Sequence, residues 1–436
     1  MPVIFWTDAL LFALFAAVLV FAAYARRHPH LRAPWGRVAR GRTAMGSAVV
    51  LAVFVAIGLL DSVHFHPRDP KPGPNGETVY EAGVLSLLDW WAEPLRTQVE
   101  KTYSAPFAIR SYAKESTETA GGSVRLYPRL RYGGAHLAGP EERGADIRQT
   151  VLLALAQGLI VWLWLAGSWT AWLARRSGQA FRVCLGRVWR NETEVPWRTI
   201  LLTLGAVILL GFLAARLGVR YHILGTDKVG QDVFYLALKS VRTGLAIGTL
   251  TTLVMLPLAL LLGLAAGYFR GWADDLIQYL YTTLNSIPSV LLIAAAILIL
   301  QVYMATHLDS GASLEERADL RLLFLCIILG VTSWTGLCRL LRAETLKLRE
   351  SDYIQAARAF GVSHFTILMR HVLPNVMHIV LITVVLDFSG LVLAEAVLSY
   401  VNIGVDPTMA SWGNMINAAR LEMAREPMVW WSLAAA

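Results

Sequence analysis

The sequence predicts an all-α polytopic membrane protein. Of its 436 residues, 56% are hydrophobic and only 16% are charged, and the apolar residues are gathered in long runs. A helix of about 20 apolar residues crosses the hydrocarbon core of a bilayer. Because no water inside the bilayer can satisfy backbone N–H and C=O groups, runs of this length form helices there.

Eight apolar runs are long enough to be membrane spans. No Lys or Arg precedes the first run and several Arg residues follow it, which favours an uncleaved helix with its N-terminus outside over a signal peptide. The runs, in chain order, are 4–24, 44–60, 150–172, 199–217, 245–268, 277–304, 322–341 and 376–398.

The placement of arginine supports this topology. If the spans alternate from an outside N-terminus, the Arg-rich loops fall on the cytoplasmic side, as the positive-inside rule expects. The predicted cytoplasmic loops are 25–43, 173–198 and 342–374, and the predicted outer loops are 61–148, 305–320 and 399–427. The net charge of +8 therefore belongs to these loops, and we expect no nucleic-acid partner.

We divide the chain into four parts. Residues 1–60 hold two N-terminal transmembrane helices, 61–148 form a periplasmic segment, 149–198 hold the third transmembrane helix and a basic cytoplasmic loop, and 199–436 form the transmembrane core. A last apolar stretch starts at Met428 and has nine residues, too few to cross a bilayer, so the last helix is expected to be incomplete.

The periplasmic segment is predicted to be a small cap or docking surface. Apolar residues at helical spacing favour an amphipathic helix over 81–102, which Pro94 would kink or break. Glycine-rich turn signals mark loops at 116–122 and 132–140.

The most informative stretch lies between the last two spans, at 351–375. It predicts a helix, a turn and a second helix. Ser351 or Asp352 can cap the first helix and Ser363 the second. Gly361 is placed to end the first helix, because glycine adopts the left-handed conformation without steric cost. Pro374 fits the first turn of the next span, where a missing N–H does no harm.

This stretch resembles the EAA loop of binding-protein-dependent ATP-binding-cassette (ABC) importer permeases. In that family the loop, here 351–374, is a coupling helix that docks into a groove on a cytoplasmic ATPase. The resemblance implies that motion of the ATPases reaches this chain through the loop. One departure is that Gln355 stands where the family name has glutamate. The matching residues are Gln355, Ala356, Ala357, Gly361, Ile367, Leu373 and Pro374.

Three further stretches are similar to signatures of the dipeptide, oligopeptide and nickel permeases of the same family. HILGTDKVGQDVFYLALKSVRTGLAIG at 222–248 resembles the signature that opens the core, and EAVLSYVNIGVDPTMASWGN at 395–414 resembles one near its end. TLNSIPSVLLI at 283–293 lies between them. Together with the loop, these matches extend over residues 220–415 and leave residues 1–195 outside the resemblance.

The resemblance implies a type I ABC importer permease core with an N-terminal extension of extra helices. Such a chain is not an enzyme and has no cofactor or metal of its own, since partner subunits bind ATP. The implied partners are a second homologous permease, two cytoplasmic ATPases, a periplasmic substrate-binding protein and membrane lipid. The implied location is the bacterial inner membrane, and the cargo is peptides or similar small solutes.

The sequence itself contains no GxxxxGK[ST] phosphate loop, no HExxH and no GxSxG motif. ATP hydrolysis needs backbone amides around the phosphates and a lysine, which nothing in the sequence supplies. Two alternative hypotheses remain: a membrane-embedded sensor or enzyme acting through 61–148, and a secondary transporter. Neither explains the loop at 351–374.

Four polar residues inside predicted spans are candidates for lining the translocation pathway. Asn285, Ser286 and Ser289 flank a proline, and broken helices are tolerated beside a water-filled cavity. Asp387 is ionisable in the last complete span, where a charge usually faces a pore or a partner. Glu395, eight residues on, is expected near the outer interface and in contact with water.

Overall fold

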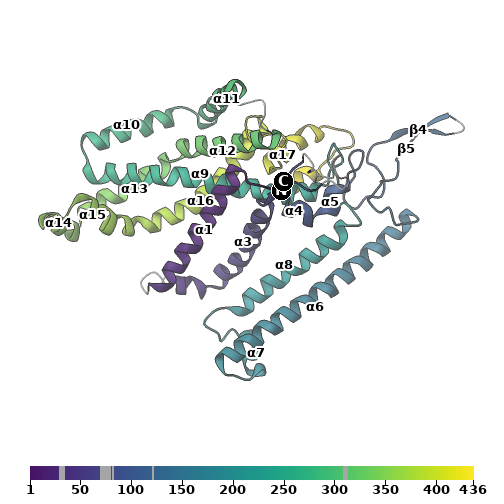
Figure 1. Ribbon diagram of the computed structural model, residues 1–436, viewed down its shortest axis with the longest axis horizontal. Coiled ribbons are helices and arrows are strands. Elements are labelled where there is room, and N and C mark those ends of the chain that lie inside the picture. The colour runs from purple at the N-terminus through teal and green to yellow at the C-terminus, as the bar shows by residue number, and fades with distance from the viewer. Residues whose placement is uncertain (29–34, 69–79, 81–82, 120–121, 308–312) are drawn as a thin grey trace, which may run out of the picture. The chain divides into compact units, whose positions relative to one another are not determined.

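The computed structural model describes residues 1–28, 35–68, 80, 83–119, 122–307 and 313–436, so the predicted loops 25–43, 61–148 and 305–320 are described in part. Contacts divide the chain into two compact units. Unit 1 comprises Met1–Val3, Phe12–Arg242 and Ala419–Ala436. Unit 2 comprises Ile4–Leu11 and Thr243–Ala418. Figure 1 labels the elements.

The all-helical fold class is confirmed. Among the described residues, seven helices are long and apolar enough to cross a membrane, and one bent helix pair passes the same test when its two helices are taken together. Each lies on a predicted run. The unbent spans are α1 (Trp6–Arg27), α3 (Arg42–Asp61), α6 (Arg143–Ser177), α8 (Trp197–Gly218), α9 (Val233–Phe269), Leu314–Arg349 (α12, Leu314–Ser333, and α13, Thr335–Arg349) and His364–Tyr400 (α15, His364–Ile367, a π-helix at Leu368–Val372, and α16, Leu373–Tyr400).

In unit 1, α6 and α8 run side by side and α7 (Phe181–Trp189) lies at one end of the pair (Figure 1). Small residues allow the two long helices to approach closely, as is usual between membrane helices. A Cβ on Gly205 would lie 2.5 Å from Nε1 of Trp162. The same indole donates a hydrogen bond to the carbonyl of Leu201 at 2.7 Å.

The segment 61–148 contains more strand than the sequence predicts. A three-stranded antiparallel sheet has the order β1-β2-β3 and pairs Pro2 with Phe65 and Phe65 with Leu85. The N-terminus and this segment therefore lie on the same side, as the predicted alternation of spans requires. The strands are β1 (Pro2–Val3), β2 (His64–Phe65) and β3 (Leu85–Ser86).

Two predictions for this segment need correction. The helix expected at 81–102 is shorter than predicted and is interrupted beside Pro94, as expected. It consists of α4 (Leu87–Trp91), which Ser86 caps, and α5 (Glu93–Thr97), which has Pro94 in its first turn. The loop expected at 116–122 is instead a hairpin, in which β4 (Glu115–Thr119) pairs with β5 (Gly122–Leu126). The pairing of β4 with β5 decides the structure of this stretch.

A buried ionic cluster joins this segment to the stretch that precedes α9. The imidazole of His222 is 1% exposed and lies 2.8 Å from Asp232 and 3.4 Å from Glu100. Glu100 also accepts hydrogen bonds from the backbone N–H groups of Arg131, Tyr132 and Gly133. These bonds hold residues 100, 131–133 and 222–232 together as one structure.

The cluster makes the stability of unit 1 depend on pH. Burial alone would lower the pKa of His222, but hydrogen bonds to Asp232 and Glu100 outweigh it and raise that pKa from 6.5 to about 9. Burial alone would raise the pKa of Glu100, but hydrogen bonds from His222 and the backbone outweigh it and lower that pKa from 4.5 to about 2.

We therefore expect resistance of the segment to proteolysis to be greatest between about pH 4.5 and 6.5. Stabilisation by the His222 cation is complete below its unfolded pKa and is lost as pH rises through about 9. Stabilisation by the Glu100 anion is lost as pH falls through about 2. Limited proteolysis across this pH range checks the prediction, and a resistance that keeps rising from pH 7 to pH 10 would contradict it.

Unit 2 is built around α9, α13 and α16. A buried apolar core joins them and includes Met255, Leu337 and Val376. A bidentate pair, in which Arg342 donates to both oxygens of Asp274 at 2.6 and 2.7 Å, fixes α10 (Trp272–Ser286) against α13. Glycines bring α9 close to α13, since a Cβ on Gly263 would lie 2.8 Å from the Cβ of Leu341.

The predicted span 277–304 is not one straight helix. α10 and α11 (Ser289–His307) meet at 87°. Ile287 is extended, with φ −95° and ψ 130°, because the residue before a proline is pushed out of the helical region. Pro288 also lacks the N–H that would continue the helix. This segment is therefore a broken span or a re-entrant loop.

Candidate functional site

The predicted coupling loop lies at the C-terminal end of α9. Arg349, the last residue of α13, donates to the carbonyl of Tyr268 at 2.8 Å. The hydroxyl of Tyr268 is 2.9 Å from Nδ1 of His364 at the start of α15. Arg270 and Glu350 form an ion pair at 2.7 Å. Three contacts, two from the residues that precede the loop and one from its middle, thus tie it to the end of α9.

The turn of the loop is the one that its sequence predicts. Gly361 follows α14 (Asp352–Ala359) with φ +76°, a conformation favourable to glycine. The N–H of Gly361 donates to Arg358 and the N–H of Val362 donates to Ala357, at 3.0 and 3.1 Å. This pair of bonds is a Schellman motif, which ends a helix by satisfying its last carbonyls.

Of the predicted caps, the second is found and the first is not. The Ser363 hydroxyl accepts a hydrogen bond from the N–H of Thr366 and so caps α15. Ser351 occupies the N-cap position of α14, but its hydroxyl donates back to the carbonyl of Leu348 instead of capping. Pro374 lies in the first turn of α16, as expected.

The loop has an inner and an outer face. Ile354, Ile367 and Val372 are fully buried in the core of unit 2. Two of the predicted coupling residues, Ala357 and Leu373, pack against that core and so face inward. The other four, which are Gln355, Ala356, Gly361 and Pro374, are exposed.

Sequence reasoning missed the largest side chains of the outer face. Phe360 is 87% exposed, Phe365 is 71% exposed, and Tyr353 is also exposed. Three aromatic rings on one short loop are thus exposed outside the predicted membrane spans. The signal was available in the sequence, since Phe360 and Phe365 flank the Gly361 turn.

The candidate pathway residues are found in two places. Asp387 lines a cavity of about 440 Å³ together with Ser333, Gly336, Arg339 and Thr383. The other candidates are exposed at the α10–α11 bend and are not among the residues that line this cavity. Asn285 there accepts a hydrogen bond from Thr335, the Ser286 hydroxyl donates to the carbonyl of Thr282, and Ser289 starts α11.

Glu395 is not in contact with water, contrary to expectation. It is 2% exposed, and the hydroxyls of Ser399 and Ser411 donate to its Oε1. A Cβ on Gly413 would lie 2.8 Å from the same oxygen. The 395–414 signature is therefore a packed corner between α16 and α17 (Trp412–Glu422), in which the glycine makes room for the carboxylate.

The first part of the 222–248 signature, residues 222–233 in unit 1, is likewise a packed turn. Gly230 has φ +83°, and a Cβ there would lie 1.8 Å from the carbonyl oxygen of Glu100. Gly225 has φ +71° and a similar approach to Ser104. Thr226 is fully buried and its hydroxyl donates to the carbonyl of Thr102 at 2.9 Å. Segment 61–148 therefore folds around this signature.

Within unit 2, the loop and the 395–414 signature lie at opposite ends of α9. A Cβ on Gly244 would lie 2.7 Å from the indole of Trp412, whereas Tyr268 contacts His364 of the loop. Gly244 and Tyr268 are roughly 36 Å apart along the helix at 1.5 Å per residue. The hydrocarbon core of a bilayer is about 30 Å thick, so α9 is long enough to separate the two motifs by one membrane.

Several membrane spans, with a short, capped and exposed helix pair between two of them, are the arrangement expected of a multi-pass transport permease. Comparison with known proteins agrees. Residues 259–436 match the family described as "Binding-protein-dependent transport system inner membrane component". This part of the chain is similar to that family, and the match together with the long apolar helices indicates a multi-pass protein of the bacterial inner membrane. The resemblance noted in the sequence is confirmed.

Similar curated proteins are permeases. The chain is 32% identical over 208 residues to the glutathione transport system permease protein GsiD of Pectobacterium atrosepticum, covering 48% of the chain and 63% of that relative. It is 31% identical over 195 residues to the oligopeptide transport system permease protein OppC of Mycobacterium tuberculosis, covering 45% and 62%. It is 30% identical over 209 residues to a putative peptide permease protein of Brucella suis, covering 48% and 63%. The match thus spans less than two thirds of each relative.

Proposed function

We propose that this chain is a permease subunit of an ATP-binding-cassette importer and forms part of the pathway for peptides or similar small solutes. The observation that carries the proposal is the arrangement along α9, with the coupling loop at one end and the 395–414 signature at the other. This is the geometry that an importer needs to connect a cytoplasmic motor with an outer face. The similarity to glutathione and oligopeptide permeases supports the class of cargo.

In this proposal the exposed face of the loop binds an ATPase subunit, and a second permease and a binding protein complete the importer. Phe360 and Ala356 lie on that face, whereas Ile354 and Ile367 anchor the loop in the core of α9, α13 and α16. Because packed cores shift between discrete arrangements and do not deform continuously, displacement of the loop moves the spans as a group. Nucleotide binding to the partner then selects between two orientations of the pathway.

Labelling of single cysteines tests the sidedness on which the proposal depends. The cysteines among the described residues, Cys184, Cys326 and Cys338, are all buried, which gives a low background. We expect Ala356→Cys to react with a membrane-impermeant maleimide in inverted vesicles only. Thr408→Cys, exposed beside the 395–414 signature, should react in right-side-out vesicles only. Reaction of both positions from the same side would refute the proposal.

Asp387 is proposed to contact the cargo within the pathway. A carboxylate and Arg339 line the same cavity, and such a pair suits a solute with one positive and one negative terminus. We expect Asp387→Asn to lower uptake of such a solute roughly tenfold, since hydrogen bonds to charged groups contribute about 1.5–3 kcal/mol. Uptake in proteoliposomes is the measurement. Asp275→Asn, an exposed change on α10, is the control, and equal uptake by the two variants would exclude this role.

A further inference from the structure

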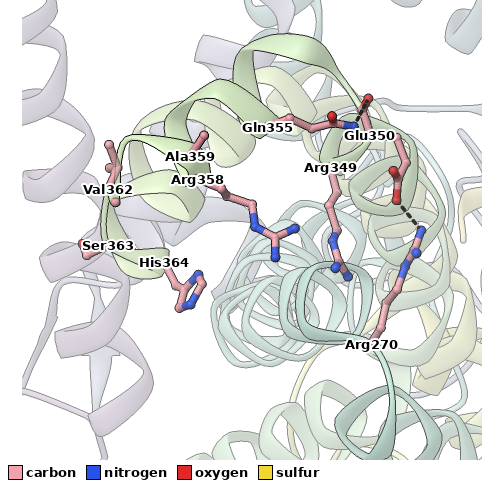
Figure 2. A pocket seen from close by; sticks show the side chains of 10 residues that line it. Arg270, Arg349, Glu350, Gln355, Arg358, Ala359, Val362, Ser363 and His364 are labelled. Atoms are coloured by element: carbon pink, nitrogen blue, oxygen red, sulfur yellow. Dashed lines mark hydrogen bonds and ion pairs between the residues drawn. The ribbon is translucent and has the colours of Figure 1, made fainter.

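A cavity of about 840 Å³ lies beside the coupling loop, and its walls are strongly basic. Figure 2 shows the guanidinium groups of Arg270, Arg349 and Arg358 directed into this space, with the imidazole of His364 on the other side. Glu350 is the only carboxylate among the lining residues. The lining therefore carries three permanent positive charges and one negative charge before any contribution from His364.

The positive charge is only partly neutralised. Glu350 pairs with Arg270 at 2.7 Å, and Arg349 donates to the carbonyl of Tyr268, a neutral group. Arg270 and Arg358 lie close enough to Arg349 for their charges to repel it. Within the described part of the chain, no carboxylate lies within ion-pair distance of Arg358. Bringing an anion into the cavity would relieve this repulsion.

The position of the cavity indicates where such an anion comes from. Arg270 follows the last residue of α9 and Arg349 is the last residue of α13, so both lie where membrane helices end. The exposed rings of Phe269 and Trp272 flank Arg270 along the chain, and aromatic rings at helix ends favour the level of the lipid headgroups. The cytoplasmic leaflet, on which the loop is predicted to lie, is rich in anionic lipid.

We propose that this cavity binds the phosphate group of an anionic phospholipid. Arginine presents a planar set of N–H donors that matches phosphate oxygens, and several arginines around one cavity provide such sets from different directions. The cavity volume suits a small polar headgroup. A bound lipid would bridge the ends of α9 and α13 with α14 and α15, and so would set how firmly the loop is held.

Lipid binding to the purified full chain tests this site without any ATPase partner. Native mass spectrometry would compare phosphatidylglycerol with the zwitterionic phosphatidylcholine. We expect the unaltered chain to retain phosphatidylglycerol preferentially. Arg358→Gln should lower the affinity for phosphatidylglycerol roughly fivefold. Glu350→Gln should raise it by a similar factor, because Arg270 then loses its ion-pair partner. A loss of affinity in one variant and a gain in the other, both caused by neutralising a residue that lines the cavity, distinguish a binding site from a general loss of structure.

Arg182→Gln, an exposed neutralisation on α7, is the matched control and should bind lipid as the unaltered chain does. If Arg358→Gln retains phosphatidylglycerol fully, or if the unaltered chain does not discriminate between the two lipids, the site is refuted. The melting temperature of the purified chain is measured with each ligand. If millimolar inorganic phosphate raises it as much as phosphatidylglycerol does, the cavity binds soluble phosphate and the proposal of a lipid ligand is refuted. Because ATP is absent, none of these outcomes depends on the proposed transport function.

Discussion

A transporter assembled with the Gly361→Pro variant is expected to lose nearly all of its substrate-stimulated ATP hydrolysis. Proline fixes φ near −65°, whereas Gly361 has φ +76° and donates its N–H to Arg358. The Schellman turn cannot form, so α14 changes direction relative to α15 while the spans stay intact. ATPase activity in proteoliposomes, with and without binding protein and cargo, is the measurement.

Gly361→Ala is the graded control for this prediction. The left-handed conformation costs a residue with a Cβ about 1–2 kcal/mol, and no other atom lies within 4 Å of the position, so partial coupling should remain. A second test uses the outer face, where Ala356→Trp should block docking and Ala356→Ser should not. Normal stimulation of both Gly361→Pro and Ala356→Trp, at normal levels of inserted protein, would mean that the motor does not act through this loop.

Glu100→Ala is expected to open the segment 61–148 locally. The change leaves the buried His222 cation without one of its two carboxylates and three backbone N–H groups without their acceptor. Breaking one partner of a buried ion pair typically costs about 3–5 kcal/mol. Hydrogen exchange at the amides of residues 131–133 measures the effect directly, because these amides donate to Glu100.

The control for this change is Glu115→Ala, which removes an ion pair between Glu115 and the exposed Lys101. Exposed pairs contribute at most about 1 kcal/mol, so the protection of residues 131–133 should be unchanged. Equal exchange rates in the Glu100 variant and the unaltered chain would show that the cluster does not hold the segment together.

The membrane spans and the loop turn were predictable because each depends on local properties. Span length follows from apolar composition alone, and Gly361 and Ser363 act through their own backbone and side-chain geometry. The inward orientation of Ala357 was not predictable in the same way. Alanine occupies both faces of α14, so the sequence pattern does not indicate which alanine meets the core and which remains exposed.

Contacts between distant residues explain the remaining differences. Proline at 288 predicts an interruption, but the 87° angle depends on partners in α13, namely Thr335 for Asn285 and Arg342 for Asp274. The ionic cluster joins Glu100 to His222, 122 residues later in the chain. No periodicity connects residues so far apart, and the two-residue strands around Phe65 are too short to leave an alternating pattern.

The bend between α10 and α11 has a consequence for the lifetime of the protein in the cell. α10 extends only about 22 Å, which is less than the thickness of the hydrocarbon core. If α10 is the first half of a broken span, Ile287 and Pro288 therefore lie inside the hydrocarbon core. Backbone groups freed by the break cost several kcal/mol when they face lipid, and Asn285 to Ser289 are exposed on this chain. We therefore expect a copy synthesised alone to be degraded quickly. If the second permease proposed above covers this segment, its co-synthesis should lengthen the half-life of the chain.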